Sequence, residues 1–383
     1  MMCKLSDICE FVKGKVAVSN LTKTNYISTE NMLPNRGGIV EATTLPSVDT
    51  TQTYTKCDIL VSNIRPYFKK IWFATTSGGC SNDVLVFRAK KDVNPFYLYY
   101  ILSDDRFFNY ATATSKGTKM PRGDKIAIMN YKIEKLSRSE QDVIASILRP
   151  IDEKIALNRE INNNLLEQIR AICKTMVIDR SDVELSPISE HCIVVTKGTT
   201  PTTLGKPFVN QGINFIKAES ILDDHSFDRS KFAYIDDETN QMLRRSIIQR
   251  DDIVYTIAGT LGRFALVDEQ VLPANTNQAV AIIRVDKKKL SSEYLYSLFI
   301  ADWQNEYYSK HIQQAVQANL SLTTIKSLPI PMLKGDAMED YVSLITPIIS
   351  KMKEIEHENA LLSSTRDSLL PKLMSGELDV ARI

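Results

Sequence analysis

The chain has 383 residues, of which 43% are hydrophobic and 24% are charged. This balance is typical of a soluble globular protein and excludes a disordered or collagen-like chain, and the length predicts two domains of about 100–200 residues each. No stretch approaches the roughly 18 consecutive apolar residues of a membrane span, and the first residues lack the apolar core of a signal peptide. We therefore expect a cytoplasmic protein with no membrane segment.

The net charge of +1 conceals an uneven distribution. Residues 1–136 carry 19 basic against 12 acidic side chains (+7), whereas residues 181–333 carry 15 against 18 (−3). If the chain binds nucleic acid, its total charge will not supply the affinity, and we expect a partner to contribute part of it. The six cysteines form no C-x-x-C pair and no histidine stands at zinc-finger spacing, so we expect reduced thiols and no metal site.

Residues 1–136 are predicted to form a mixed α/β domain. Short β-rich runs, among them ILVSNI, KIWFAT and DVLVFRA, precede an amphipathic helix at 95–111. Polar and basic residues follow these runs in the loops. The candidate binding residues of this domain are Ser62, Asn63, Arg65, Tyr67, Lys69, Lys70, Ser81, Asn82, Lys116, Lys119 and Arg122.

Residues 137–180 are predicted to form one long helix. Ser137 and Glu140 have the spacing of a capping box at its start. Apolar residues then alternate at intervals of four and three, which is typical of a coiled-coil seam with a polar centre. The expected seam positions are Ile144, Leu148, Ile151, Ile155, Asn158, Asn162 and Leu165. Because a buried Asn in a seam costs stability but fixes register and partner, this helix is expected to have one specified partner.

Residues 181–333 are predicted to form a second α/β domain, with strands at DIVYTIAG, RFALVD and AVAIIRV before a helix at 292–312. Its candidate binding residues are Thr256, Gly259, Thr260, Gly262, Arg263, Asn275, Asn277, Gln278 and Asn319. Residues 334–383 are predicted to form a second long helix, whose seam positions are Ile345, Ile348, Met352, Ile355, Asn359 and Leu362.

Several features recur at a nearly constant distance along the chain. Asp58 returns as Asp252, 194 residues later, and Asn82 returns as Asn277, 195 residues later. The helix start at Tyr97 and the helical residue Pro150 both return 197 residues later. The sequence therefore contains two copies of one unit, each a globular part followed by a long helix.

The simplest use of two such helices is to pair with each other. Antiparallel pairing would place the globular parts at opposite ends of a shared rod, and a helix over 138–175 would span roughly 55 Å, or about 16 base pairs. The alternative is an ordinary coiled-coil spacer or dimerisation helix.

We find no enzyme motif in the sequence. It has no phosphate-binding G-x-x-x-x-G-K-[ST] loop, no Gly-rich dinucleotide turn after a strand, and no methyl-donor loop. The repeated loops instead carry Thr, Asn, Gln and Arg side chains, which can contact phosphates and base edges. Each loop taken alone is more typical of a hairpin turn or a solvated surface than of a binding site, and it is the recurrence of these loops at matched positions that favours a shared binding role.

The sequence resembles the specificity subunit of Type I DNA restriction-modification systems over its whole length. The segments that carry the resemblance are SRSEQDVIASILRPIDEKIALNREINNNLLEQIRAI, RDSLLPKLMSGELDV, CDILVSNIRPYFKKIWFA with GGCSNDVLVFR, and DIVYTIAGTLGRFALVD with NTNQAVAIIR. The resemblance implies a mixed α/β fold with target-recognition domains at 1–136 and 181–333 and conserved helices at 137–180 and 334–383. The helices would form an antiparallel coiled-coil pair with an internal pseudo-two-fold repeat.

The same resemblance implies a subunit with no catalytic activity of its own. Each recognition domain would read one half of an asymmetric double-stranded DNA target, and the helix pair would set the unread spacer. Two methyltransferase subunits would dock on this chain and methylate an adenine in each half-site, and two motor-nuclease subunits would complete an ATP-dependent endonuclease. S-adenosylmethionine, ATP and Mg²⁺ would then belong to the partner subunits.

Three alternatives remain open from the sequence. The chain could serve a related system in which the nuclease is fused to the methyltransferase, which neighbouring genes would reveal. It could be a coiled-coil scaffold with two protein-binding heads, which predicts no DNA binding even with a methyltransferase present. An autonomous DNA enzyme would require a methyl-donor or nuclease site that the sequence does not show.

Overall fold

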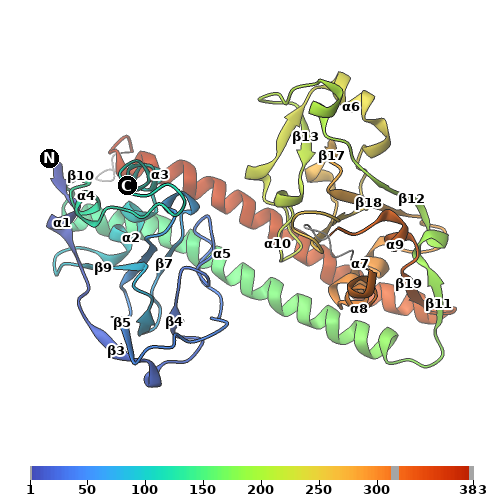
Figure 1. The fold of residues 1–383 in the computed structure, drawn as a ribbon, viewed down its shortest axis with the longest axis horizontal. Helices are drawn as coiled ribbons and strands as arrows, with labels where there is room; N and C mark the ends of the chain where they lie inside the picture. The colour runs from blue at the N-terminus through green and yellow to red at the C-terminus, as the bar shows by residue number, and fades with distance from the viewer. Residues whose placement is uncertain (1, 312–318, 379–383) are drawn as a thin grey trace. The chain divides into compact units, whose positions relative to one another are not determined.

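The computed structural model describes residues 2–311 and 319–378, which form two compact units (Figure 1). Unit 1 consists of residues 1–156 and 360–383, and unit 2 consists of residues 157–359. Two long helices, α5 (Arg138–Cys173) and α10 (Asp336–Met374), contribute a segment to each unit. Each unit therefore combines one globular part with parts of both helices.

The globular part of unit 1 contains two four-stranded sheets and one strand pair. The first sheet has the antiparallel order β2-β9-β6-β7, and the second has the order β3-β5-β8-β4, in which β4 and β8 run parallel. The strands are β1 (Met2–Lys4), β2 (Cys9–Phe11), β3 (Lys15–Ala17), β4 (Tyr26–Ile27), β5 (Thr50–Tyr54), β6 (Ile59–Ser62), β7 (Ile71–Phe73), β8 (Gly78–Cys80), β9 (Val84–Ala89) and β10 (Lys132–Glu134), which pairs with β1.

Helices cover the first sheet of unit 1 and form its main core with it. They are α1 (Leu5–Ile8), α2 (Pro95–Ser103), α3 (Asp105–Ala113) and α4 (Lys125–Met129). The same core includes Leu148 of α5 and Leu370 of α10. The single helix predicted at 95–111 is wrong, because the chain breaks at Asp104. The Asp104 carboxylate accepts the backbone N–H of Arg106 at 2.7 Å and so caps α3 as a new helix.

Unit 2 repeats this architecture. Its sheets have the orders β12-β18-β15-β16 and β14-β13-β17, with β13 and β17 parallel, and β11 pairs with β19. The strands are β11 (Glu184–Pro187), β12 (Cys192–Lys197), β13 (Ile213–Ile216), β14 (Ala233–Ile235), β15 (Ile253–Thr256), β16 (Phe264–Leu266), β17 (Ala274–Thr276), β18 (Val280–Val285) and β19 (Pro329–Met332). The helices are α6 (Asp237–Met242), α7 (Ser292–Ile300), α8 (Trp303–His311) and α9 (Leu322–Lys326), so the helix predicted at 292–312 is also divided.

An ion pair to a buried carboxylate recurs at matched positions and confirms the internal repeat. In unit 1, Arg88 on β9 donates two hydrogen bonds of 2.7 Å to the carboxylate of Asp58. In unit 2, Arg284 on β18 makes the same two bonds of 2.7 Å to Asp252. Asp58 directly precedes β6, and Asp252 directly precedes β15. These strands occupy the same place in the strand order of their four-stranded sheets.

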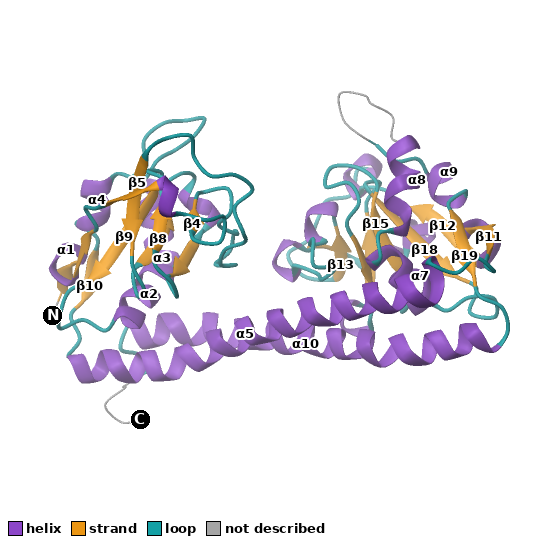
Figure 2. Ribbon diagram, turned by 90° about the horizontal axis from the view of Figure 1, so that it is seen from below, coloured by secondary structure: helices purple, strands orange, loops and turns teal. Residues whose placement is uncertain are grey.

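The segments of α5 and α10 run antiparallel within each unit, on one side of the sheets (Figure 2). In unit 1, Arg366 contacts the carboxylate of Asp152 at 2.9 Å. In unit 2, the Asn158 amide donates to the Asn359 side-chain oxygen at 2.9 Å. In the same unit, the Cys173 and Tyr341 side chains are hydrogen-bonded, so residue numbers there rise along α5 as they fall along α10.

Burial follows the predicted seam over most of both helices. The buried seam residues are Ile144, Leu148, Ile155, Asn158, Ile345, Met352 and Ile355, and the partly exposed ones are Ile151, Asn162, Leu165, Ile348, Asn359 and Leu362. At two positions in unit 2 the buried residue lies one place after the predicted one, because Leu166 and Ile349 are more deeply buried than Leu165 and Ile348. A straight helix repeats every 3.6 residues, and this stretch also packs against the core of unit 2, so the buried face drifts from a strict seam.

The polar centre of the seam is present in unit 2. Asn158 is fully buried, and its amide also donates to a carboxylate oxygen of Glu358 at 2.8 Å. Because a displaced register would leave this buried amide without acceptors, the contact favours one alignment of the two helices.

Candidate nucleic-acid interface

Three loops that are separate in the sequence meet at one edge of unit 1. The backbone N–H of Asn63 donates to the carbonyl of Asp83 at 2.8 Å, and that of Gly123 donates to the carbonyl of Asn63 at 3.1 Å. The Arg122 guanidinium lies 3.1 Å from the Asp83 carboxylate. The residues predicted around 62–70, 81–83 and 116–122 therefore share one surface.

The side chains on this surface differ in exposure. Tyr67, Asn82, Lys116, Lys119 and Arg122 are exposed, and Arg65, Lys69, Lys70 and Ser81 are partly buried. The Lys69 ammonium pairs with Asp105 at 2.9 Å, and the Lys70 ammonium donates to the Thr29 carbonyl at 2.6 Å. Burial lowers the pKa of Lys70 below its ordinary value. The outward cationic surface therefore consists mainly of residues 116–122.

Two expectations for unit 1 need correction, because Ser62 and Asn63 are buried. The Ser62 hydroxyl donates to the Ile64 carbonyl at 3.1 Å, and the Asn63 backbone joins the other two loops. These residues build the loop junction and expose little side-chain surface.

Sequence reasoning missed Arg36 and Phe68. The Arg36 backbone N–H donates to the Lys69 carbonyl at 2.9 Å, and its guanidinium pairs with Asp105. Phe68 is 39% exposed beside Tyr67. No local signal marked Arg36, because its loop lies about thirty residues upstream of the strand that it supports.

Unit 2 brings its predicted loops together by the same backbone bonds. The N–H of Ile257 donates to the Ala279 carbonyl at 2.8 Å, and the N–H of Leu320 donates to the Ile257 carbonyl at 3.0 Å. Ile257 and Leu320 correspond to Asn63 and Gly123 of unit 1 in the repeat. The same junction therefore carries different side chains in the two units.

Around this junction, Gly259, Gln278 and Asn319 are exposed, and Thr260, Gly262, Arg263 and Asn277 are partly buried. The Arg263 guanidinium makes two hydrogen bonds of 2.7 Å to the exposed carboxylate of Asp223, and Thr260 donates to the Ala218 carbonyl at 3.1 Å. The Thr200 hydroxyl donates to the Gln278 side chain. The cation predicted to read a base is thus held by a carboxylate at the surface.

In unit 2, the prediction that Thr256 and Asn275 are binding residues is corrected, because both side chains are fully buried. The Thr256 hydroxyl accepts the backbone N–H of Arg263 at 2.8 Å and donates to the Thr260 carbonyl, which closes the turn. The Asn275 amide donates to the Asn240 side-chain oxygen at 2.9 Å. Both residues shape the loops from inside.

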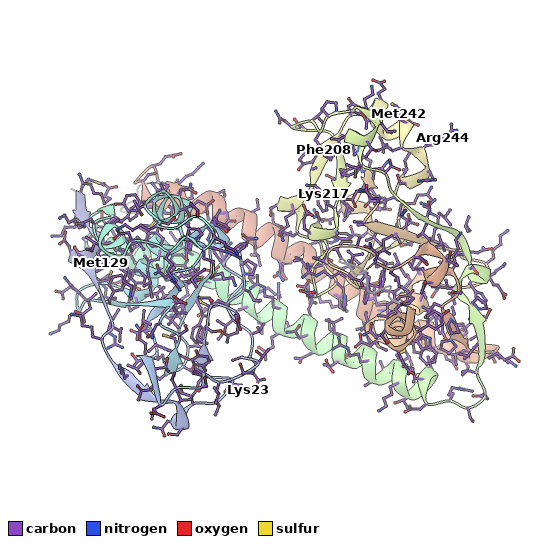
Figure 3. The ribbon with its side chains drawn as sticks, in the orientation of Figure 1. Lys23, Met129, Phe208, Lys217, Met242 and Arg244 are labelled. Atoms are coloured by element: carbon purple, nitrogen blue, oxygen red, sulfur yellow. The ribbon has the colours of Figure 1, made fainter. Side chains whose placement is uncertain are left out.

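Further exposed and partly buried side chains of unit 2 lie in the segments around its second sheet. Figure 3 shows Phe208, Lys217, Met242 and Arg244 around the region of β13 and α6. The Lys217 ammonium lies 5.8 Å from the centroid of the Phe208 ring, and Arg244 is exposed. These residues come from three separate stretches of the chain, at 208, 217 and 242–244, so no single sequence motif could have grouped them.

A histidine beside the Arg263 turn gives unit 2 a pH-dependent stability. The His225 ring stacks on Phe264 with centroids 4.1 Å apart, and burial lowers the pKa of His225 to about 4. The unfolded chain, with a pKa near 6.5, takes up the proton first, so the free energy of unfolding falls as the pH drops from about 6.5 to about 4, by at most about 3 kcal/mol. We expect His225→Asn, which tolerates the left-handed backbone at this position, to flatten this dependence in urea unfolding at pH 7 and pH 5. An unchanged difference between the two pH values would contradict this assignment.

Among residues 2–311 and 319–378, no group of three or more His, Cys, Asp or Glu side chains could hold a metal ion. In the same part of the chain, no helix is long and apolar enough to cross a membrane.

Comparison with known proteins identifies similar chains. A family model described as Type I restriction modification DNA specificity domain matches residues 1–167 and 180–356. The two matches correspond to the two copies of the internal repeat.

Two curated relatives align over most of this chain. The MjaIX specificity subunit of a Type I restriction enzyme from Methanocaldococcus jannaschii is 21% identical, over 81% of this chain and 74% of the relative. The HindI specificity subunit of a Type I restriction enzyme from Haemophilus influenzae is 21% identical, over 98% of both chains. A crystal structure of the S subunit of a Type I restriction-modification system from M. genitalium has a TM-score of 0.56 at 14% identity and covers 98% of this chain and 96% of that one. This last likeness shows a shared fold.

Proposed function

Because this chain belongs to the Type I restriction modification DNA specificity domain family, we propose that it is a non-catalytic subunit in which units 1 and 2 each read one half of a two-part DNA target. One observation supports the proposal that the DNA target has two parts. The loops of both units meet through the same pair of backbone hydrogen bonds, yet they present different side chains there. A backbone junction that is repeated in both units but carries different side chains is what two unrelated half-sites would require.

The exposed and partly buried candidates define the proposed DNA-contacting surface. In unit 1 they are Arg65, Tyr67, Lys69, Lys70, Ser81, Asn82, Lys116, Lys119 and Arg122; in unit 2 they are Gly259, Thr260, Gly262, Arg263, Asn277, Gln278 and Asn319. Lys and Arg bind phosphates by charge, whereas Asn, Gln and Arg can pair with base edges. The charge of −3 on residues 181–333 makes this half dependent on a partner for phosphate binding.

We assign the recognition domains to 1–136 and 181–333 and the helices to 137–180 and 334–383. The helix pair sets the unread spacer between the half-sites and docks two methyltransferase subunits. Two motor-nuclease subunits complete the restriction complex, and S-adenosylmethionine, ATP and Mg²⁺ act in these partners. The Asn158–Asn359 contact supports a fixed helix register, which a spacer of constant length requires.

The proposal is tested by selection from random double-stranded DNA with the purified complex of this chain and the methyltransferase encoded beside it. We expect a two-part motif whose unread spacer has one length. A complex that enriches no motif would favour the coiled-coil scaffold, and a motif with a variable spacer would overturn the role of the helices.

Arg263 offers a sharper test within unit 2, because one ion pair can be broken from either side. Arg263→Ala should weaken binding of the second half-site by about 1–3 kcal/mol if the guanidinium contacts a base. Asp223→Ala breaks the same pair but leaves the cation in place, so we expect no loss of affinity. Equal losses in the two variants, measured by titration of labelled DNA, would show that the pair acts only on the loop structure.

A further inference from the structure

The turn from β6 to β7 in unit 1 and the turn from β15 to β16 in unit 2 join an inner strand to an edge strand, and they take a similar path with different residues. In unit 1, Val61 pairs with Ile71, and in unit 2, Tyr255 pairs with Phe264. Counted from these pairs, Arg65 corresponds to Gly259 and Lys69 corresponds to Gly262.

All four of these turn residues have a positive φ angle. In unit 2 the two glycines have φ values of 77° and 92°, which glycine adopts freely. In unit 1, Arg65 and Lys69 have φ values of 50° and 51°, a region that residues with a Cβ disfavour. Unit 1 therefore has side chains at two positions where unit 2 has glycine in the same backbone conformation. Such strained backbone conformations cluster at functional sites.

The backbone holds the unit 1 turn rigidly. Pro66 begins a single 3-10 turn at Pro66–Phe68, and the N–H of Arg65 donates to the Pro121 carbonyl at 2.8 Å. The N–H of Asn35 donates to the Phe68 carbonyl at 2.9 Å. Because backbone bonds fix the loop, little conformational entropy remains to be lost when its side chains bind a ligand.

Arg65 is the basic residue of this turn that lacks a partner. Its Nε is buried without an acceptor, and among residues 2–311 and 319–378 its guanidinium makes no ion pair. Lys69, by contrast, is paired with Asp105. A buried donor without an acceptor costs free energy. The Arg65 side chain as a whole is partly exposed, and its charge, which no carboxylate neutralises within the described residues, can attract an anion.

The same turn carries two aromatic residues, Tyr67 and Phe68. Tyr67 is 48% exposed, and its ring centroid lies 4.8 Å from that of Phe68. A turn that carries both exposed aromatic rings and a cation without an ion pair can bind a phosphate and stack on the adjacent sugar or base.

We propose that the strained turn at residues 65–69 contacts DNA directly, with Arg65 bound to a backbone phosphate and Tyr67 stacked on the neighbouring nucleotide. This inference rests on the proposed function and deepens it. In this proposal, the backbone strain at Arg65 is retained because a glycine at this position would remove the guanidinium that binds the phosphate.

The test uses substitutions whose effects on stability and on binding have opposite signs. Arg65→Gly relieves the backbone strain, so we expect the thermal midpoint of unit 1 to rise by about 2–4 °C. In the complex with methyltransferase, the same variant should bind the selected DNA roughly tenfold more weakly, with the slope of log K against log salt reduced by about 0.9. Tyr67→Ala should weaken binding about 5–100-fold with an unchanged salt slope.

Cys57→Gly is the matched control. Cys57 also has a positive φ of 72° and is exposed before the central strand of the same sheet, away from the turn. We expect it to raise the midpoint similarly and to leave DNA affinity unchanged. A lower midpoint in Arg65→Gly, or wild-type affinity and salt slope in that variant, would overturn the inference. Loss of motif-specific binding by the wild-type complex would instead overturn the proposed function.

Discussion

Replacing residues 181–333 with the corresponding part of another member of the family will change one half of the DNA motif and leave the other half unchanged. The expected change is complete, because every residue of unit 2 proposed to contact DNA lies within the replaced segment. The first half-site depends on loops at 62–70, 81–83 and 116–122, whose backbone bonds join them to one another.

The boundaries of the exchange preserve both long helices, which begin at Arg138 and Asp336. The motif is read by methylation mapping of cells that express the chimera with the same methyltransferase. The reciprocal exchange of residues 1–136 is the control and should change only the other half. Alteration of both halves by either exchange would contradict independent reading by the two units.

The second large effect concerns the repeated ion pair to a buried carboxylate. Asp252→Ala should destabilise unit 2 by about 3–5 kcal/mol, because it leaves Arg284 with no carboxylate in a largely buried position. The Asp252 carboxylate is fully buried and also accepts the backbone N–H of Gln249 at 2.7 Å. The same substitution therefore also removes the hydrogen-bond acceptor of the Gln249 N–H.

The matched substitution in unit 1 should cost less. Asp58 is buried to a similar degree, but the Arg88 side chain is 41% exposed, against 20% for Arg284. Water can therefore solvate Arg88 when Asp58→Ala removes its partner. Urea unfolding of the two variants measures both losses, and the double variant Asp252→Ala with Arg284→Leu should recover part of the stability. An equal or larger loss from Asp58→Ala would contradict this account.

The features predicted correctly from the sequence are those set by local patterns. The period of apolar residues predicts α5 and α10, and the recurrence of Asp58 as Asp252 predicts the repeat that the sheets confirm. The seam was misplaced by one position where Leu166 packs into the core of unit 2, because that contact depends on a sheet formed later in the chain.

The direction in which a loop side chain points could not be predicted. Asn275 is buried by Asn240, 35 residues away, and Arg263 is held by Asp223, 40 residues away. Only the folded chain brings these partners together. The left-handed backbone of Arg65 was likewise hidden, because no local pattern predicts a positive φ for arginine.

The central claim is that this chain selects the DNA that its partners modify. The most direct measurement is co-expression with the methyltransferase encoded beside it, in a host without other modification, followed by genome-wide mapping of methylated adenine. The account predicts one two-part motif with a constant spacer, methylated only when this chain is present. A soluble complex that methylates no motif, or a motif that persists without this chain, would contradict it.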